Sequence, residues 1–265
     1  MCMVVNRHKD IIINKYSNYD EDSRLVEHRA HNIEYLTTMR YIQKFLKPGA
    51  KILEIGAATG RYSITLAKMG YDVTAVDLTP KHVEIMKKKS RRLKNFQCMV
   101  ADALDLSMFK NSSFDMVLNL GPMYHLFHQK DKNQAVKETI RVTKKNGICM
   151  FAYISNASMI TNYGLRHNKI HDLYSVMDKT GRFKDIPEEI FMSFYVEDFK
   201  KLFTKTNTTY ITNVAVDGVA PAMREWVESL SKKNYQEFLN WHFITCERPD
   251  QQGYSNHLLY ICRKK

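Results

Sequence analysis

Residues 52–60 read ILEIGAATG, a short apolar run that ends in a glycine-bearing turn and leads into a helical pattern over residues 61–70. A strand followed by such a turn and a helix binds phosphate in many dinucleotide enzymes, because the turn lets a ligand approach the backbone and the helix N-terminus attracts anions. Other ligands use the same arrangement. The stretch predicts an α/β domain and leaves open which cofactor this turn binds.

Strand and helix patterns alternate on both sides of this turn. An amphipathic helix is expected over 33–46, where Lys47-Pro48-Gly49 ends it. Strands are expected at 51–55, 72–77, 96–102, 114–120 and 147–154, with helices at 61–70, 82–90 and 131–143. Five β/α units of this kind predict a doubly wound parallel sheet.

The rest of the chain has a different texture. Residues 155–193 are irregular and rich in Asn, His, Tyr and Phe, and such a long connection is expected to be functional or mobile, here as a cap over an active site. A helix at 195–203 and strands at 210–216 and 257–264 follow, with a helix-like stretch at 222–241. We expect one domain, divided into an N-terminal helical arm (1–47), a cofactor-binding core (48–154), a substrate cap with its helix (155–207) and a final strand pair (208–265).

Composition limits the class of protein. The 265 residues are 44% apolar, enough for one substantial core, and they contain neither an apolar run of 18 residues nor the pattern of a secretory signal. A soluble, cytoplasmic protein without a membrane partner is expected. The five cysteines lack the spacing of a zinc site or a disulfide framework, so we expect free thiols and no metal.

The formal charge of +12 could indicate an acidic partner such as nucleic acid. The densest basic run, 87–92, ends an amphipathic helical pattern, where cations are also expected on a solvated face and near the C-terminal dipole. A nucleic-acid partner is therefore possible but not favoured.

The glycine turn does not fit a dinucleotide fingerprint. That motif needs glycines where this chain has Ala58 and Arg61, and no Walker loop follows. Glu54 two residues before Gly56, then Ala58 and Gly60, instead resembles motif I of the class I S-adenosylmethionine-dependent methyltransferases, with alanine in the middle position. The two glycines could also simply close a tight turn.

Further motifs extend the resemblance along residues 51–154. In that family, Asp77 would accept hydrogen bonds from the ribose hydroxyls, Leu78 would pack on adenine, and Asp102 with Ala103 would meet the adenine edge. Residues 114–119 look like motif IV, and carbonyls near Asn119 and Gly56 would receive the methionine ammonium. Asp77 and Asp102 could each cap a helix instead, but all four signals lie at carboxyl ends of strands, where open α/β sheets bind ligands.

The resemblance implies more about the fold and the cofactor. It implies a Rossmann-like, doubly wound, mostly parallel seven-stranded sheet with an antiparallel last strand and helices on both faces. It also implies S-adenosylmethionine as cofactor and S-adenosylhomocysteine as product. The stretches at 60–80 and 119–127 look like a bacterial branch of small, mostly uncharacterised methyltransferases.

Methyl transfer is a direct displacement that needs alignment more than a strong base. The loop after motif IV, 119–125, lacks the Asn/Asp-Pro-Pro-Tyr of adenine methylation, which weakens that function. Tyr124 and His125 are the candidate catalytic residues, since a histidine near neutrality could accept a proton, although both could serve packing alone. Tyr16 and Arg24 of the arm could close on cofactor or substrate.

Three residues nearer the cap, Tyr153, Tyr163 and Arg166, are further candidates for substrate contact. We therefore expect a methyltransferase that acts on a small-molecule acceptor. An RNA or protein methyltransferase and a cofactor-binding regulator without activity are the alternatives, and the oligomeric state stays open.

Overall fold

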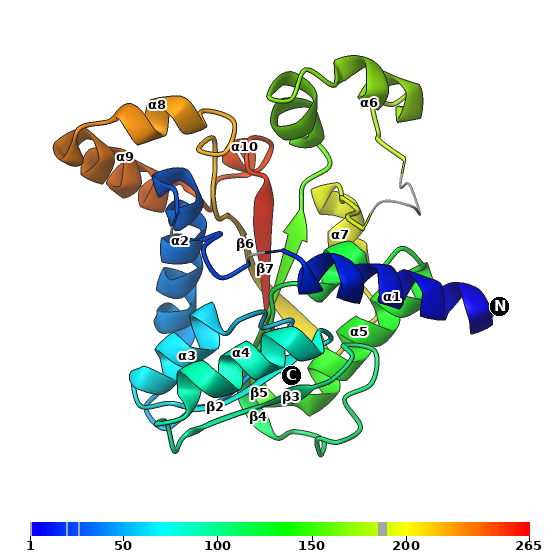
Figure 1. Cartoon of the computed structure of the whole chain (residues 1–265), viewed down its shortest axis with the longest axis vertical. Coiled ribbons are helices and arrows are strands. Elements are labelled where there is room, and N and C mark those ends of the chain that lie inside the picture. Colours follow the sequence, from blue (N-terminus) through cyan, green and yellow to red (C-terminus); the bar gives the residue numbers. More distant parts are fainter. Residues whose placement is uncertain (1, 20, 26, 185–189) are drawn as a thin grey trace.

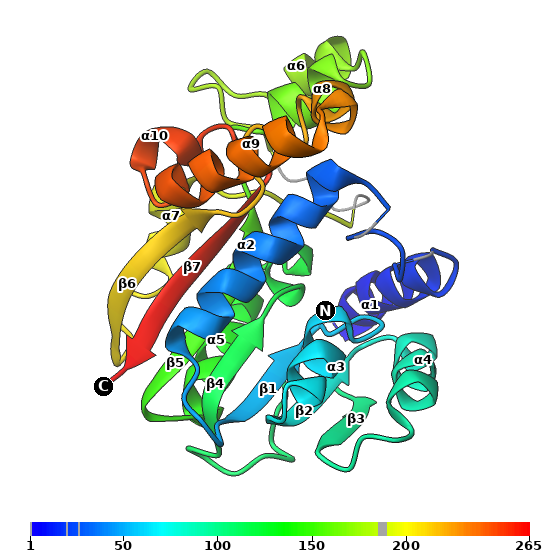
Figure 2. The same ribbon diagram turned by 90° about the vertical axis from the view of Figure 1, so that its left-hand side faces the viewer.

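The computed structural model describes residues 2–19, 21–25, 27–184 and 190–265. One sheet runs through the molecule (Figure 2) and consists of β1 (Lys51–Ile55), β2 (Asp72–Asp77), β3 (Phe96–Val100), β4 (Phe114–Asn119), β5 (Thr143–Ile154), β6 (Thr208–Ala215) and β7 (His257–Lys264). The strand order is β3-β2-β1-β4-β5-β7-β6. β1 to β5 are parallel, and β7 is antiparallel to both β5 and β6. The predicted fold class is confirmed.

Helices cover both faces of this sheet (Figures 1 and 2). α2 (Arg29–Phe45), α3 (Arg61–Lys68) and α4 (Pro80–Ser90) pack on one face, and α5 (Gln129–Val142) and α7 (Val196–Lys201) pack on the other. The remaining elements are α1 (Cys2–Ser17), the 3-10 helix η1 (Pro122–His125), the π-helix η2 (Ile160–Leu165), α6 (Ile170–Val176), α8 (Arg224–Ser229), α9 (Lys232–Thr245) and α10 (Pro249–Gln252).

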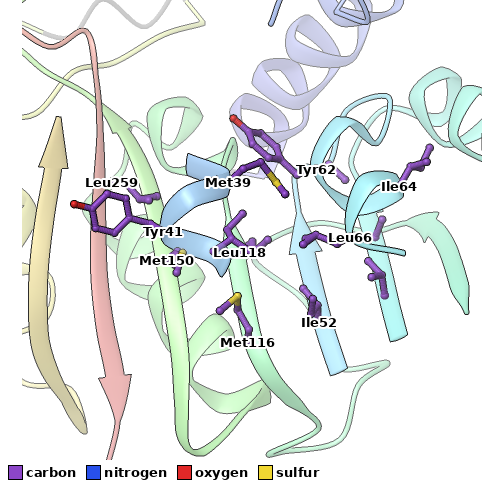
Figure 3. Packing of buried hydrophobic residues seen from close by; sticks show 14 of the residues in the cluster. Met39, Tyr41, Ile52, Tyr62, Ile64, Leu66, Met116, Leu118, Met150 and Leu259 are labelled. Atoms are coloured by element: carbon purple, nitrogen blue, oxygen red, sulfur yellow. The ribbon is translucent and has the colours of Figure 1, made fainter. Parts of the chain in front are cut away.

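Alternation of side chains along the strands divides the core into two layers. Ile52, Leu118 and Met150 face α2 and α3, where they meet Met39 and Leu66 (Figure 3). These side chains are almost fully buried, and each such burial contributes about 1.5–3 kcal/mol. This layer fixes α3 against the sheet and with it the glycine turn that begins the helix.

Tyr153 belongs to the opposite layer, which corrects its expected contact with substrate. Its side chain is fully buried, its ring stacks on Phe199 with centroids 3.9 Å apart, and its hydroxyl donates to Oδ1 of Asn213 at 3.1 Å. Tyr153 sits on the strand face opposite Ala152, which lines the cavity described below. The tyrosine therefore acts in packing.

Several elements gather beyond the carboxyl edge of the parallel strands. α6, α8 and α9 lie past this edge, and α1 lies beside α4 (Figures 1 and 2). The helix-like stretch at 222–241 is two helices, because the chain breaks at Leu230 and Ser231 accepts from the backbone N–H of Asn234 at 3.2 Å as the N-cap of α9. The segment 208–265 thus holds three helices between its two strands, where the sequence predicted one helix-like stretch.

Cys98, Cys149, Cys246 and Cys262 are free thiols. No helix in the described ranges combines the length and the apolar character needed to cross a membrane.

Candidate functional site

A cavity of about 580 Å³ follows the carboxyl edge of the sheet. Its wall takes Asp102 from beyond β3, Asp77 from the end of β2, Gly56 from beyond β1, Gly121 from beyond β4 and His257 from the start of β7. This sequence of residues follows the order of the strands across the sheet. Of the predicted cofactor residues on β1, β2 and β3 and just after them, all but Gly60 line one half of the cavity, and a second half extends past β4.

The glycine turn approaches the loop after β4 closely. Gly56 has φ +73° and Gly60 has φ +85°, a backbone region that favours glycine. A Cβ on Gly56 would lie 2.7 Å from Cδ of Pro122, and one on Gly60 would lie 2.8 Å from Cδ1 of Ile64. Ala58 between them also has positive φ, +46°. Both glycines are therefore required by close contacts as well as by the turn.

Glu54 lies beneath this turn, where it caps α3. Its side chain is buried and accepts the backbone N–H of Ser63 at 2.8 Å. Burial raises the pKa of Glu54 to about 8, against the effect of the hydrogen bonds from Ser63. The predicted motif I acid is therefore mostly protonated at neutral pH in this structure, while it still lines the cavity.

Asp77 organises the turns around it. Its carboxylate accepts from the backbone N–H groups of Ala58 and Thr79, both at 2.8 Å, and lies 3.2 Å from Nδ1 of His82. Nε2 of His82 is buried and has no hydrogen-bond partner within the described ranges, although His82 lines the cavity. A buried polar atom without a partner is rare, and a ligand group in the cavity could supply one. Asp77 thus caps the turn before α4 and also lines the cavity, so the two roles expected for it are compatible. Leu78 lines the cavity beside it.

Asp102 and Ala103 lie at the β3 end of the cavity. Asp102 accepts from the backbone N–H of Leu104 at 2.9 Å and forms an ion pair with Lys9 of α1. α1 therefore closes this end of the cavity, and the predicted adenine-edge acid already has a charged partner.

Asn119 does not line the cavity. Its side chain is fully buried, and Nδ2 donates to Oγ1 of Thr139 at 3.2 Å on α5. The strand directs this side chain to the face opposite the cavity, whereas the prediction concerned carbonyls near Asn119. Leu120 and Gly121 supply the lining here, and only the backbone of Asn119 remains a candidate.

Tyr124 and His125 both line the cavity, but their polar atoms are already bonded. Nδ1 of His125 donates to the carbonyl oxygen of Ile190 at 2.6 Å, so Nε2 accepts from the hydroxyl of Tyr16 at 3.0 Å. Burial lowers the pKa of His125 to about 4, which keeps the ring neutral. The hydroxyl of Tyr124 donates to the carbonyl of Leu120 at 3.2 Å. In this arrangement His125 holds the arm in place and has no free nitrogen to act as a base.

A charged cluster lines the half of the cavity beyond β4. Arg24 donates to Glu21 at 2.6 Å and to both oxygens of Glu34, the shorter bond being 2.9 Å. Nδ1 of His257 lies 2.9 Å from Oδ2 of Asp217 and 3.4 Å from Oε2 of Glu34. Although burial opposes ionisation of Glu34, Arg24 and His257 lower its pKa to about 2.

This cluster contains the candidate metal ligands of the described residues. One ligand atom each from Glu34, Asp217 and His257 lies within 4.8 Å of the others. The same Glu34 oxygen, however, accepts from the Arg24 guanidinium at 2.9 Å. A divalent cation there would lie against a positive charge, so the arrangement is that of an ion-pair network.

The remaining predicted substrate residues divide into two groups. Tyr16 and Arg24 line the cavity, whereas Tyr163 and Arg166 do not, and 41% of the side chain of Tyr163 is exposed. Among the described residues of 155–184, none lines the cavity. The role of residues 155–207 as a cap stays a prediction.

Sequence reasoning missed Glu34, His82, Asp217 and His257. They come from four separate segments, and only the tertiary structure brings them to one edge. The one available signal was the place of His257 as the first residue of an antiparallel last strand, which puts it at the same edge as the carboxyl ends of the parallel strands.

Comparisons with known proteins identify the core of the chain. Residues 52–147 match a family model described as "Methyltransferase domain". A demethylmenaquinone methyltransferase of Staphylococcus carnosus is 27% identical over 137 residues, which are 51% of this chain and 54% of that protein. A glycine/sarcosine N-methyltransferase of Parasynechococcus marenigrum is 32% identical over 111 residues, 41% of this chain and 39% of that protein. The chain thus spans about half or less of the length of these curated relatives.

A solved structure extends the likeness of fold to nearly the whole chain. A protein from Thermotoga maritima, described as a SAM-dependent methyltransferase and possible histamine N-methyltransferase, superimposes with a TM-score of 0.59. It is 18% identical, and the match covers 98% of this chain and 99% of that one. The likeness at this identity concerns the fold.

Proposed function

We propose that this chain, whose residues 52–147 match a methyltransferase domain, is an enzyme that moves the methyl group of S-adenosylmethionine to a small-molecule acceptor. The observation that carries the proposal is one continuous cavity along the sheet edge, which is lined by Gly56, Asp77 and Asp102 in one half and continues past β4 into a second half.

The residues of the first half suit the cofactor. The N-terminus of α3 offers backbone donors for a carboxylate. Asp77, with the unpartnered His82 beside it, suits the ribose hydroxyls, and Leu78 suits an adenine face. Bound there, the cofactor would supply a methyl group activated by a sulfonium.

The second half suits a metabolite better than a polymer. The whole cavity measures about 580 Å³, within the usual range of roughly 300–1,000 Å³ for small-molecule sites. Ala152, Val216 and Leu259 form an apolar wall, and Arg24 with Glu34 forms a charged one. An acceptor with an apolar body and a polar reacting end would match both walls.

The net positive charge of the chain is the argument for an RNA acceptor. Some of the lysines that contribute to it make contacts within the protein. On α4, Lys81 donates to the carbonyl oxygen of Ser17 at 2.5 Å, and Lys89 forms an ion pair with Asp22. These lysines attach the N-terminal arm to the core. They are therefore partly engaged within the protein.

The experiment is a transfer assay with radiolabelled S-adenosylmethionine. The acceptors are a naphthohydroquinone, sarcosine, histamine and bulk ribosomal RNA, chosen from the chemistry of the relatives and of the RNA alternative. We expect label in one of the small molecules and a loss of at least about tenfold in kcat/KM for Asp77→Ala, equivalent to ~1.4 kcal/mol. Label in RNA alone, or in no acceptor, would contradict the proposal.

A further inference from the structure

His257 and Asp217 form a rigid pair on the wall of the cavity beyond β4. Asp217 is buried, and its Oδ2 lies 2.9 Å from Nδ1 of His257. The carboxylate also accepts from the backbone N–H of His257 at 3.1 and 3.2 Å and from Oγ of Ser255 at 2.6 Å. These bonds hold the carboxylate in one orientation and thereby fix the imidazole ring.

This contact decides which nitrogen of His257 is free. A neutral imidazole carries one N–H, and the Asp217 carboxylate at 2.9 Å, closer than the amide Nδ2 of Asn256 at 3.3 Å, places it on Nδ1. Nε2 then keeps its lone pair and, within the described ranges, has no hydrogen-bond partner. Because His257 lines the cavity and its Nδ1 edge is turned to Asp217, the opposite edge of the ring is the one available to a bound molecule.

Other histidines of the cavity are less suited to this task. Both nitrogens of His125 are bonded, to Ile190 and Tyr16. Nε2 of His8 lies 3.1 Å from the carbonyl oxygen of His125. His82 has a free Nε2, but it lies beside Asp77 in the cofactor half. His128, the N-cap of α5, has no carboxylate within the described ranges to fix its ring, whereas Asp217 fixes that of His257.

The sheet explains why His257 stands there. β7 is antiparallel, so its first residue pairs with the last residue of β5, Ile154, at the carboxyl edge. The His257 ring centroid is 6.3 Å from that of Tyr124, which belongs to the loop after β4. His257 therefore stands two strands beyond β4, the strand whose loop borders the cofactor half.

We propose that His257, positioned by Asp217, accepts the proton of the methyl acceptor, and that this acceptor attacks through a hydroxyl or a neutral amine N–H. The inference rests on the proposed function and adds the class of acceptor group. As the acceptor oxygen or nitrogen forms its bond to the methyl carbon, the methyl–sulfur bond breaks and its electron pair stays on sulfur as a neutral thioether. The acceptor proton passes to Nε2, and Asp217 balances the imidazolium charge until the proton leaves to solvent.

The charged groups that face His257 set its pH dependence. Glu34 of α2 and Asp217 beyond β6 are acidic, Arg24 before α2 is basic, and Tyr124 of η1 is neutral. Burial by itself lowers the pKa of His257, but Glu34 and Asp217 raise it above the ordinary value of 6.5. Since only the neutral ring accepts a proton, activity falls as the pH drops through this raised pKa.

The first test needs no acceptor. Nitrogen-15 NMR of the histidine rings in the full-length protein saturated with S-adenosylhomocysteine, assigned by comparison with His257→Gln, gives the pKa and tautomer of His257. We expect an Nδ1–H tautomer and a midpoint above 6.5, and we expect Asp217→Asn to lower that midpoint. A ring that carries its proton on Nε2, or that does not titrate, would overturn the inference.

The second test compares kinetics. With the acceptor found in the transfer assay, His257→Gln is expected to lower kcat by about 10²–10⁴-fold, the usual contribution of a general base, and to abolish the acidic limb of the pH profile. Its affinity for S-adenosylhomocysteine should stay within about twofold of the parent, because glutamine preserves the polar wall. His171→Gln on α6, exposed and outside the cavity, is the matched control with parental kinetics.

The outcomes separate this inference from the proposed function. A parent protein that binds cofactor and transfers methyl groups, with His257→Gln equally fast and its acidic limb retained, overturns the inference alone. A parent that transfers to no acceptor overturns the proposed function and the inference with it. Activity lost in EDTA and restored by a divalent cation would assign Glu34, Asp217 and His257 to a metal and would also overturn the inference.

Discussion

Gly56 shows how one residue connects the two loops of the site. Its Cα lies under the loop after β4, and an added Cβ would be 2.7 Å from Cδ of Pro122. Gly49 has nearly the same φ, +71° against +73°, but nothing lies within 4 Å of its Cβ position. Both glycines have a positive φ that would strain any other residue. Of the two, Gly56 alone also has neighbouring atoms close to its Cβ position.

This pair gives a matched prediction. Gly49→Ala is expected to cost about 1 kcal/mol through its positive φ alone. Gly56→Ala should cost roughly 1–3 kcal/mol more, because Pro122 must move, and it should weaken S-adenosylhomocysteine binding at least about tenfold. Urea unfolding and calorimetry would measure both. Equal effects of the two substitutions would refute the close approach of Gly56 to Pro122.

The second prediction at the residue scale concerns the titration of Glu54. The pKa of its carboxyl is raised from 4.5 to about 8 in the folded protein, so the folded state holds a proton that the unfolded state releases. This contribution to the free energy of unfolding is complete below pH 4.5 and is lost as the pH rises through about 8.

Glu54→Gln removes this titration and keeps an oxygen for the N–H of Ser63. The stability of the variant relative to the parent is therefore expected to increase between pH 5 and pH 8, measured by urea unfolding at several pH values. A difference that does not change with pH would show that Glu54 is ionised in the folded protein.

Sequence patterns predicted the site residues that belong to one strand-and-turn motif. They did not predict residues that distant segments bring together. Glu54, Gly56 and Asp77 were found because strand and turn spacing fixes their places at one edge. Glu34 and His257 are 223 positions apart, and no local pattern shows that His257 Nδ1 lies 3.4 Å from Oε2 of Glu34. Tyr153 was misplaced because only the observed pleat tells which strand residue faces the cavity.

At the scale of elements, α1 belongs to the N-terminal helical arm (1–47) that the sequence predicted, but its bounds and its contacts were not predicted. The sequence of Cys2–Ser17 has no clear apolar repeat, yet the structure is helical there. Ion pairing of Lys9 with Asp102 and hydrogen bonding of Tyr16 with His125 attach α1 along the cavity. Buried Ile12 adds an apolar contact, but polar contacts hold much of this helix, so no apolar stripe marks it in the sequence.

Cofactor binding should therefore stabilise α1. When α1 opens and exposes the cavity, the bound ligand must leave, so ligand binding opposes this opening. Backbone hydrogen exchange over residues 8–17 is therefore expected to slow by up to about 100-fold at a ligand concentration of 100 Kd. α9, which does not line the cavity, is the internal control and should change little. Equal exchange of α1 with and without S-adenosylhomocysteine would contradict its role as a wall of the site.

The strands were predicted better than the helices around them. Apolar runs between turn residues located all seven strands, since burial of a central sheet leaves a strong pattern. The break between α8 and α9 at Leu230 was missed because helical patterns continue across it and only the Ser231 cap marks it.

At the scale of the whole molecule, one edge of the sheet lines both halves of the cavity. β1, β2 and β3, within or next to the stretch that matches a methyltransferase domain, bring Gly56, Asp77 and Asp102 to this edge, while β7, antiparallel, brings His257 to it. The cavity along this edge joins the two halves, so donor and acceptor would meet near the loop after β4.

Titration calorimetry of the full-length protein with S-adenosylmethionine and S-adenosylhomocysteine tests this arrangement most directly, with Asp77→Ala as the comparison. One molecule of either ligand is expected to bind per chain, and Asp77→Ala is expected to weaken binding at least about tenfold because the ribose loses its carboxylate partner. Absence of binding by both ligands, or equal affinity of parent and variant, would contradict it.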